Sequence, residues 1–358
     1  MNKSVFLQII VAALSLIPLA AHAKEHGYID THMHFQSQRS GGGGSGRGRP
    51  NSRGYREAAS SLVSQMNRYR VEKAVIMPPP QTMEKEGRYD YRVLMEAIRD
   101  HPGRLYLAAG GGTLNAMIHS VEPSEVTAAL RKRFEDQAKE LVQAGAVAFG
   151  ETTAMHVCMA EWHNYSAQAP DHPLFLLLAD LAARYGVPID LHMEAIPESM
   201  TTPQNLRDAC SKNPTRLPAT LPAFERLLAH NRQAKIVWQH IGWDNVGFMT
   251  TKLLSRLLAE HPNLYLAIRV EERGRQVGGG GPMPNRIVDA DWRVRPEWLK
   301  LMETFPGRFM VGGDEFVGSA RKMPQSFEET WSLLKQLPPA LARTVGRDNA
   351  ARVYRLSD

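Results

Sequence analysis

The chain has 358 residues, of which 43% are hydrophobic, and its 43 basic and 37 acidic residues give a net charge of +6. This length suits one large α/β barrel or two ordinary domains. The positive charge is spread out and forms no basic stripe with interleaved aromatic residues, so we predict no nucleic-acid partner. The two cysteines, Cys158 and Cys210, are too few for a disulfide scaffold or a cysteine-based metal site, although they could pair in an oxidising compartment.

Residues 1–23 have the pattern of a secretory signal peptide. Lys3 gives a basic start, an apolar run covers residues 5–20, and residues 21–23 read Ala-His-Ala, a small-x-small cleavage site. We therefore predict cleavage after Ala23 and a mature chain of residues 24–358 that forms a single barrel domain. The mature protein would have no stable membrane anchor and would be periplasmic or secreted.

The mature chain alternates short apolar runs with amphipathic helical stretches. Eight apolar runs are typical of parallel strands buried on both faces; they are residues 27–34, 71–78, 104–110, 146–151, 187–193, 235–240, 263–270 and 308–314. The helical patterns are residues 55–69, 91–101, 124–144, 171–185, 221–231, 245–261, 296–305, 324–337 and 343–356. Eight βα units in this order predict an α/β fold of the (β/α)8 TIM-barrel type, with a doubly wound open sheet as the alternative.

Long irregular stretches follow the first, fourth, fifth and seventh predicted strands. Residues 36–53 and 271–295 each contain a glycine run, and as βα loops they would lie at the catalytic mouth of a barrel, where such loops are often lids. Neither run ends in the Lys-Ser/Thr pair of a phosphate-binding loop, so we reject a nucleotide site. Ser124 is the predicted N-cap of the longest helix, and Gly145 follows its end.

Five predicted strands end in histidine, aspartate or glutamate. On the first strand, His32 and His34 are two residues apart and therefore point to the same face. The other strand ends carry Glu151, His192, His240 and Asp314. On a barrel these ends surround one mouth, and a metal ion would offset the cost of burying so many ionisable groups. Nitrogen and oxygen ligands without a thiolate suit Zn²⁺, Mn²⁺, Fe²⁺ or Co²⁺, and availability favours zinc.

Four further histidines are predicted to lie outside this site. His101 and His261 each precede a proline at a helix end, which indicates capping or surface positions on the opposite side of the barrel. His156 and His163 fall in the loop after the fourth strand, and we interpret them as solvated loop residues.

These motifs resemble the amidohydrolase superfamily, most closely its amidohydrolase-related branch of metal-dependent hydrolases and decarboxylases. The resemblance rests on residues 29–34 (Ile-Asp-Thr-His-Met-His), the histidine that ends the fifth strand, residues 240–242 (His-Ile-Gly) and residues 308–314 (Arg-Phe-Met-Val-Gly-Gly-Asp). The closing residues 345–354 are similar to the last helix of that branch. The likeness covers essentially the whole mature chain.

The resemblance implies a role for each residue of the site. His32, His34 and His192 would be metal ligands, and Asp314 would be a metal-touching general acid/base. His240 would be either a ligand of a second ion or a catalytic histidine. Some binuclear members bridge two metals with a carboxylated lysine at the end of the fourth strand, where this chain has Glu151. Other members use a glutamate as that bridge, so the resemblance is compatible with one ion or two. The alternative is that Glu151 is a salt-bridged carboxylate at the strand end.

The predicted activity is that of a metal-dependent hydrolase. A metal-bound hydroxide would cleave an amide, lactone or ester bond of a small molecule, with Asp314 transferring the proton and His240 polarising the carbonyl or holding an ion. A non-oxidative decarboxylase and a non-catalytic exported binding protein remain as alternatives. Arg269 either clamps an anionic substrate or forms a salt bridge to Glu271 or Glu151. Trp243 and Trp292 either form the wall of an apolar pocket or are packing residues. The sequence leaves open whether the protein forms a homo-oligomer.

Overall fold

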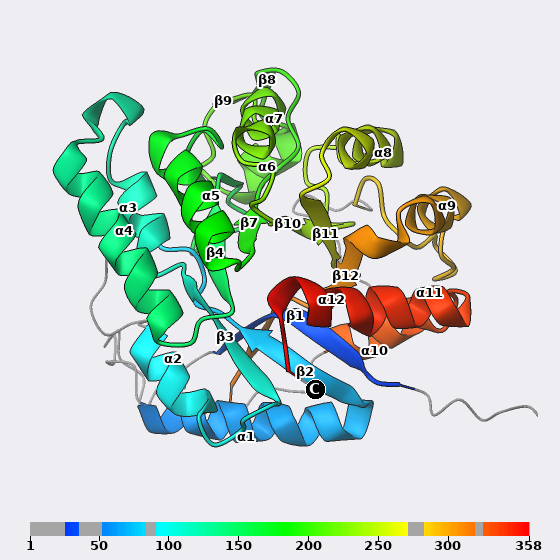
Figure 1. The fold of residues 1–358 in the computed structure, drawn as a ribbon. Coiled ribbons are helices and arrows are strands. Elements are labelled where there is room, and N and C mark those ends of the chain that lie inside the picture. Colours follow the sequence, from blue (N-terminus) through cyan, green and yellow to red (C-terminus); the bar gives the residue numbers. More distant parts are fainter. Residues whose placement is uncertain (1–25, 36–51, 84–90, 271–282, 319–324, 358) are drawn as a thin grey trace, which may run out of the picture.

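A closed barrel of parallel strands forms the centre of the molecule in this computed structural model (Figure 1). The structure describes residues 26–35, 52–83, 91–270, 283–318 and 325–357. The predicted signal peptide, residues 36–51 of the first loop and residues 271–282 of the second lie outside these ranges. The barrel strands are β1 (Tyr28–Phe35), β2 (Val71–Ile76), β3 (Leu105–Gly110), β4 (Ala148–Thr153), β7 (Ile189–His192), β10 (Ile236–Ile241), β11 (Leu264–Ile268) and β12 (Phe309–Val311).

The strands pair in chain order, and the sheet closes on itself. Each strand is parallel to the next, and β12 returns to β1 with Val311 opposite Asp30. The predicted TIM barrel is therefore confirmed, and the open sheet is excluded. Each of the eight predicted strands corresponds to one of these barrel strands, because each is a continuous apolar run that is buried on both faces.

Helices cover the outside of the barrel (Figure 1). They are α1 (Ser52–Tyr69), α2 (Tyr91–Ile98), α3 (Leu114–His119), α4 (Ala128–Gln143), α5 (Pro173–Tyr185), α7 (Leu221–His230), α8 (Thr251–Glu260), α9 (Pro296–Thr304), α10 (Gln325–Leu334), α11 (Pro339–Arg343) and α12 (Asn349–Tyr354). Between strands and helices lies the main hydrophobic core, which includes Tyr28, Phe224 and Trp238. A second cluster combines strand residues such as Val75 and Val237 with Val353 of α12. No helix in the described ranges is both long and apolar enough to cross a membrane.

Three predicted helices differ from the observed ones for identifiable reasons. Thr127, not Ser124, caps α4 and accepts the N–H of Leu130, because Pro123–Glu125 form a separate 3₁₀ turn, η1. The predicted helix 245–261 begins only at Thr251, because Asp244 accepts the backbone N–H groups of residues 246, 247 and 249 and holds them in a turn. The last predicted helix is divided into a π turn, η3 (Thr344–Asp348), and α12.

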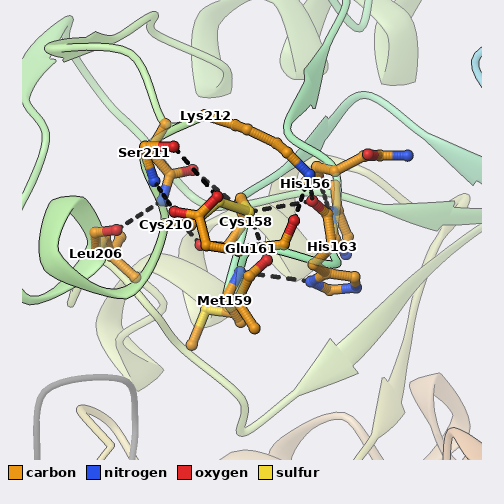
Figure 2. The surroundings of a disulfide bond; sticks show 12 residues. His156, Cys158, Met159, Glu161, His163, Leu206, Cys210, Ser211 and Lys212 are labelled. Atoms are coloured by element: carbon orange, nitrogen blue, oxygen red, sulfur yellow. Dashed lines mark hydrogen bonds between the residues drawn. A yellow bond between two sulfur atoms is a disulfide. The ribbon is translucent and has the colours of Figure 1, made fainter.

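The loops after β4 and β7 form a small cap, which we define as residues 154–168 and 199–217. The cap contains two short hairpins, β5 (Met155–His156) with β6 (Ser166–Ala167) and β8 (Met200–Thr201) with β9 (Arg216–Leu217), and helix α6 (Gln204–Ala209). Its own apolar cluster includes Val157, Leu206 and Leu217. A disulfide joins Cys158 to Cys210 across the two halves, with Cα atoms 5.8 Å apart (Figure 2), so the pairing that the sequence left open is present.

Candidate metal centre

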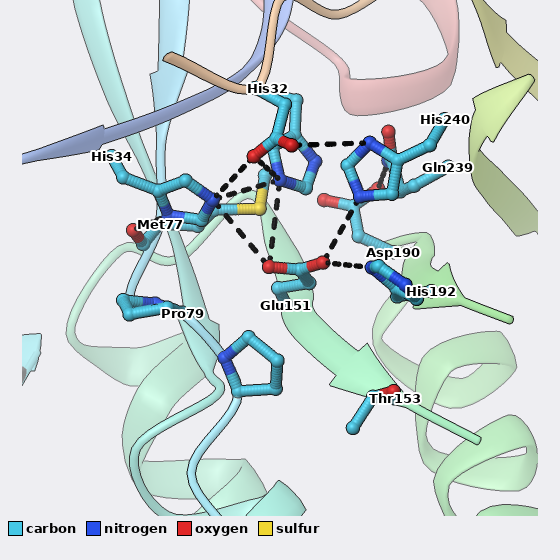
Figure 3. A network of polar contacts seen from close by, with 12 residues as sticks. His32, His34, Met77, Pro79, Glu151, Thr153, Asp190, His192, Gln239 and His240 are labelled. Atoms are coloured by element: carbon cyan, nitrogen blue, oxygen red, sulfur yellow. Dashed lines mark hydrogen bonds and ion pairs between the residues drawn. The ribbon is translucent and has the colours of Figure 1, made fainter. Parts of the chain in front are cut away.

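The two histidines of β1 point into the barrel mouth, where their Nε2 atoms lie 3.0 Å apart (Figure 3). The Nδ1–H of His34 donates to the carbonyl of Met77 at 2.9 Å, which leaves the His34 Nε2 lone pair facing inward. The backbone N–H of His32 donates to Asp30 Oδ1 at 3.0 Å, which holds the strand end. Both imidazoles are buried, so these nitrogens need a partner inside the protein.

Glu151, at the end of β4, divides its two carboxylate oxygens between two pairs of histidines (Figure 3). Oε2 lies 3.6 Å from His32 Nε2 and 3.5 Å from His34 Nε2. Oε1 lies 3.0 Å from His192 Nδ1 and 3.2 Å from His240 Nε2. Burial raises the pKa of Glu151, but the surrounding histidines, His32 foremost, outweigh burial and hold that pKa well below its usual range. Glu151 is therefore an ionised bridge between the two pairs.

Asp314 closes the cluster from the other side. Its Oδ1 lies 3.3 Å from His34 Nε2, and its Oδ2 lies 3.8 Å from His240 Nδ1 and forms an ion pair with Arg269. Burial raises the pKa of Asp314, but Arg269 and the histidines outweigh it and hold that pKa well below its usual range. The predicted salt bridge from Arg269 to Glu151 is wrong, because the guanidinium pairs with Asp314; Glu271 lies outside the described residues.

The backbone is unusual at two of these positions. His240 and Asp314 have φ angles of 62° and 53°, in the left-handed region that non-glycine residues rarely adopt. Asp314 follows Gly312 and Gly313, which interrupt the eighth strand between β12 and β13 (Glu315–Val317); both segments pair with β1. A Cβ on Gly312 would lie 2.9 Å from His32 Cβ, so only glycine allows this close approach.

The donor set fits a divalent cation. Within this cluster, three groups have potential ligand atoms that all lie within 4.8 Å of one another: His32–His34–Glu151, His32–His240–Asp314 and Glu151–His192–His240. Burial lowers the pKa of His32, but Glu151 and Asp314 outweigh it and raise that pKa to about 9, so this position stabilises positive charge. Imidazole nitrogens and carboxylate oxygens without thiolate are ligands for zinc and similar metals. The buried cluster is therefore consistent with a metal site.

The structure brings together all six residues that the sequence placed in the site, while their individual roles stay predictions. The structure also shows where Arg269, the two tryptophans and the two helix-end histidines lie. Arg269 lies over the ring of Trp243, 3.9 Å from its centroid, and Trp292 packs against the main core. His101 and His261 lie at the ends of α2 and α8, where the backbone N–H of His261 bonds to Leu257.

The prediction that His156 and His163 are solvated is wrong. Both are half-buried, and the ring centroid of His156 lies 4.8 Å from that of His192 and 4.3 Å from that of His163. Burial, together with His192 and His163, lowers the pKa of His156 to about 3, so this imidazole is neutral. The only available signal was position: His156 is two residues before Cys158, and a disulfide there would hold the loop over the mouth.

Sequence reasoning also missed a buried polar layer beneath the site. Asp190 of β7 accepts hydrogen bonds from Gln239 at 2.9 Å and from the hydroxyl of Tyr354 on α12. Burial raises the pKa of Asp190 to about 7. Its carboxylate therefore links two neighbouring strands to the last helix directly under the histidines.

Comparison with known proteins places these features in context. The family model described as amidohydrolase matches residues 29–356. Similar solved structures include an amidohydrolase II (12% identity, 92% of this chain and 100% of that chain, TM-score 0.50). A probable 2-pyrone-4,6-dicarboxylic acid hydrolase from Acinetobacter baumannii with citric acid bound has 12% identity over 92% of this chain and 99% of that chain, with a TM-score of 0.49.

An amidohydrolase from Burkholderia multivorans with bound Zn has 16% identity, covers 92% of this chain and 100% of that chain, and has a TM-score of 0.43. At these identities a structural likeness concerns the fold alone, and the amidohydrolase II structure agrees with the barrel described above. No curated protein matches the sequence.

Proposed function

The chain belongs to the amidohydrolase family, and from this premise we propose that it hydrolyses an amide, lactone or ester bond of a small-molecule substrate. One observation carries the proposal: four imidazoles and two carboxylates converge at the carboxyl ends of the barrel strands. Active sites of TIM-barrel enzymes lie at this face. Buried charges accumulate there only when function requires them, because each is costly without a partner.

We propose that the site holds two divalent ions, with zinc as the first candidate. His32 and His34 would hold one ion and His192 and His240 the other, with Glu151 between the two histidine pairs. The division of the Glu151 oxygens between the two histidine pairs supports this arrangement. When bound, such ions supply a water nucleophile at neutral pH and polarise the carbonyl of the substrate.

The protein's own groups would handle the proton. Arg269 keeps Asp314 ionised, so the Asp314 carboxylate can accept a proton from the nucleophile and return it to the leaving group. Its Oδ1 faces the β1 histidines, and its Oδ2 stays on the guanidinium, which fixes the carboxylate orientation. We assign Asp314 as general acid/base and His240 as a ligand through Nε2, which points at Glu151.

We further propose that the substrate is anionic and has an apolar body. Arg269 lies over the ring of Trp243 and forms an ion pair with the proposed proton-transfer group, and its planar fork suits a carboxylate. Phe316 of β13 stacks on His34 with ring centroids 4.4 Å apart and would form an apolar wall. The same arginine favours a second candidate, a metal-dependent decarboxylase, because it could hold a departing carboxylate.

Metal analysis and product analysis test these proposals together. Purified protein should contain close to two ions per chain, and a panel of lactones, amides and esters that carry a carboxylate should include a substrate. A ratio near one would contradict the bridging role of Glu151. Release of CO₂ in place of a new acid would select the decarboxylase. Metal binding without turnover of any compound would favour the non-catalytic binding protein.

We also propose that the protein is exported. The small-x-small site at residues 21–23 and the Cys158–Cys210 disulfide both suit an oxidising compartment. Amino-terminal sequencing of the protein from the periplasmic or secreted fraction should begin at Lys24. An intact Met1 on active, cytoplasmic protein would contradict this proposal.

A further inference from the structure

A continuous series of histidine rings runs from the cap into the candidate metal centre. Neighbouring ring centroids are 4.3–4.8 Å apart along the order His163, His156, His192, His240, His32 and His34. The last four belong to the proposed metal site. The first two come from the loop after β4, and the proposed reaction gives them no role.

Backbone contacts decide which nitrogen of each cap histidine carries the proton. His156 Nδ1 lies 2.8 Å from the carbonyl of Asn164, and only an N–H can pair with a carbonyl, so His156 Nε2 keeps a free lone pair. His163 Nδ1 instead accepts the N–H of Met159 at 3.4 Å. Of the two cap imidazoles, His156 is therefore the one that can accept a hydrogen bond through Nε2.

His192 needs such an acceptor if it binds a metal. Its Nδ1 faces Glu151, so the lone pair of Nδ1 would bind the ion and Nε2 would carry the hydrogen. Metal-ligating histidines almost always donate their second N–H to a protein group, which orients the ring. His34 has this support from the Met77 carbonyl at 2.9 Å, and His192 requires an equivalent acceptor beside its ring.

We propose that His156 is a positioning residue that accepts the Nε2–H of His192 and so orients this ligand for the second metal ion. The imidazole of His156 packs against His192 from the cap side, with ring centroids 4.8 Å apart, and has a lone pair on Nε2 to offer. This inference rests on the proposed metal site, and it adds a residue from outside the barrel strands to that site.

The Cys158–Cys210 disulfide lies close to His156 (Figure 2), and it fixes His156 in place together with the hydrogen bonds of Asn213. Cys158 lies two residues after His156 and is bonded to Cys210 in the other half of the cap. The Asn213 side chain accepts the N–H of Cys158 and donates to its carbonyl, both at 2.8 Å. Lys212 donates to the carbonyl of His163 at 2.8 Å. The second half of the cap thus holds the loop that carries His156 against the mouth.

The test is zinc affinity, measured without any substrate. Metal-free wild type, His156→Ala and His156→Gln would compete with a chromophoric chelator for Zn²⁺. We expect His156→Ala to weaken the second zinc about 10–100-fold, the usual effect of losing such a partner. His156→Gln should recover much of the loss, because its amide oxygen can accept the same hydrogen bond. The exposed His230→Ala, which removes an imidazole from α7, is the control.

Two more measurements separate positioning from folding. Co²⁺ absorption spectra should change in His156→Ala and return towards wild type in His156→Gln, while thermal unfolding of the metal-free proteins stays the same. A Cys158→Ala/Cys210→Ala variant that remains folded should also bind the second zinc more weakly. Unchanged zinc affinity and Co²⁺ spectrum in His156→Ala would overturn this inference alone, whereas wild type without zinc affinity would overturn the metal site itself.

Discussion

At the scale of single residues, geometry assigns different tasks to groups of the same chemical type. Glu151 is buried and Asp314 is partly exposed, and both carboxylates have a lowered pKa. Glu151 contacts histidines through both oxygens, which suits a bridge, while Asp314 shares one oxygen with Arg269. Strand-end position predicted that both residues lie in the site. The partner of Arg269 could not be predicted. Asp314 is 45 residues away in the sequence, and its side-chain direction depends on a left-handed backbone conformation that the sequence does not reveal.

Asp314→Asn and His32→Ala should both fold and lose hydrolytic activity. Asparagine cannot accept the proton, so kcat should fall about 10²–10⁴-fold for Asp314→Asn, the usual contribution of general acid/base catalysis. Steady-state kinetics measures the loss of activity, and circular dichroism checks that both variants fold. Asp136→Asn, in an exposed ion pair of α4, removes a carboxylate elsewhere and should behave as wild type. Wild-type turnover by Asp314→Asn would contradict the mechanism.

Arg269→Gln should shift the acid side of the pH–rate profile to higher pH. In the wild type, Arg269 opposes the effect of burial and keeps Asp314 ionised at acidic pH. Without the guanidinium, only the histidines oppose the effect of burial, so the pKa of Asp314 rises and the catalytic carboxylate becomes protonated at a pH where the wild type is active. The pH dependence of kcat/KM measures the shift. An unchanged acid limb would show that Asp314 ionisation does not limit the rate.

At the scale of elements, the strands were predictable and the cap was not. Barrel strands such as β2 and β10 are continuous apolar runs, and that pattern follows from burial on both faces. The cap is built from two-residue strands and a six-residue helix, which are too short to show periodicity. Its position depends on the Cys158–Cys210 distance, which sequence cannot supply. This is why the location of His156 was mispredicted.

The interruption between β12 and β13 gives a test at this scale. In Gly312→Ala the new Cβ would meet His32 Cβ at 2.9 Å and Thr31 Oγ1 at 3.1 Å, so β1 and β12 must separate. We expect a loss of about 1–3 kcal/mol in the free energy of unfolding, as for other overpacked sites, and weaker zinc binding. Chemical denaturation and metal titration measure the two effects.

The matched control is Gly307→Ala. A Cβ at Gly307 would have only the end of the Arg352 side chain, at 3.8 Å, within contact distance. Its free energy of unfolding should therefore stay close to that of the wild type. Equal stability and equal zinc affinity for both alanine variants would mean that the close approach of Gly312 to His32 has no consequence.

At the scale of the whole molecule, metal and fold should be thermodynamically linked. The proposed ligands come from four strands, β1, β4, β7 and β10, so the ions would tie together distant parts of the closed barrel. A ligand that binds only the folded state at 1,000 times its dissociation constant stabilises that state by about 4 kcal/mol per site. Stability should therefore depend on free zinc concentration.

Removal of metal by a chelator should lower the melting temperature, and added Zn²⁺ should restore it. The metal-free barrel keeps its hydrophobic core, but four imidazoles and two carboxylates stay crowded at the mouth without the cation that their arrangement suits. Differential scanning calorimetry across a zinc series measures the shift. Because His192 and His240 would hold the second ion, His192→Ala should keep only part of the response, and His32→Ala/His192→Ala should lose it. A melting temperature that is independent of zinc in the wild type would mean that these six residues form a polar network without a metal.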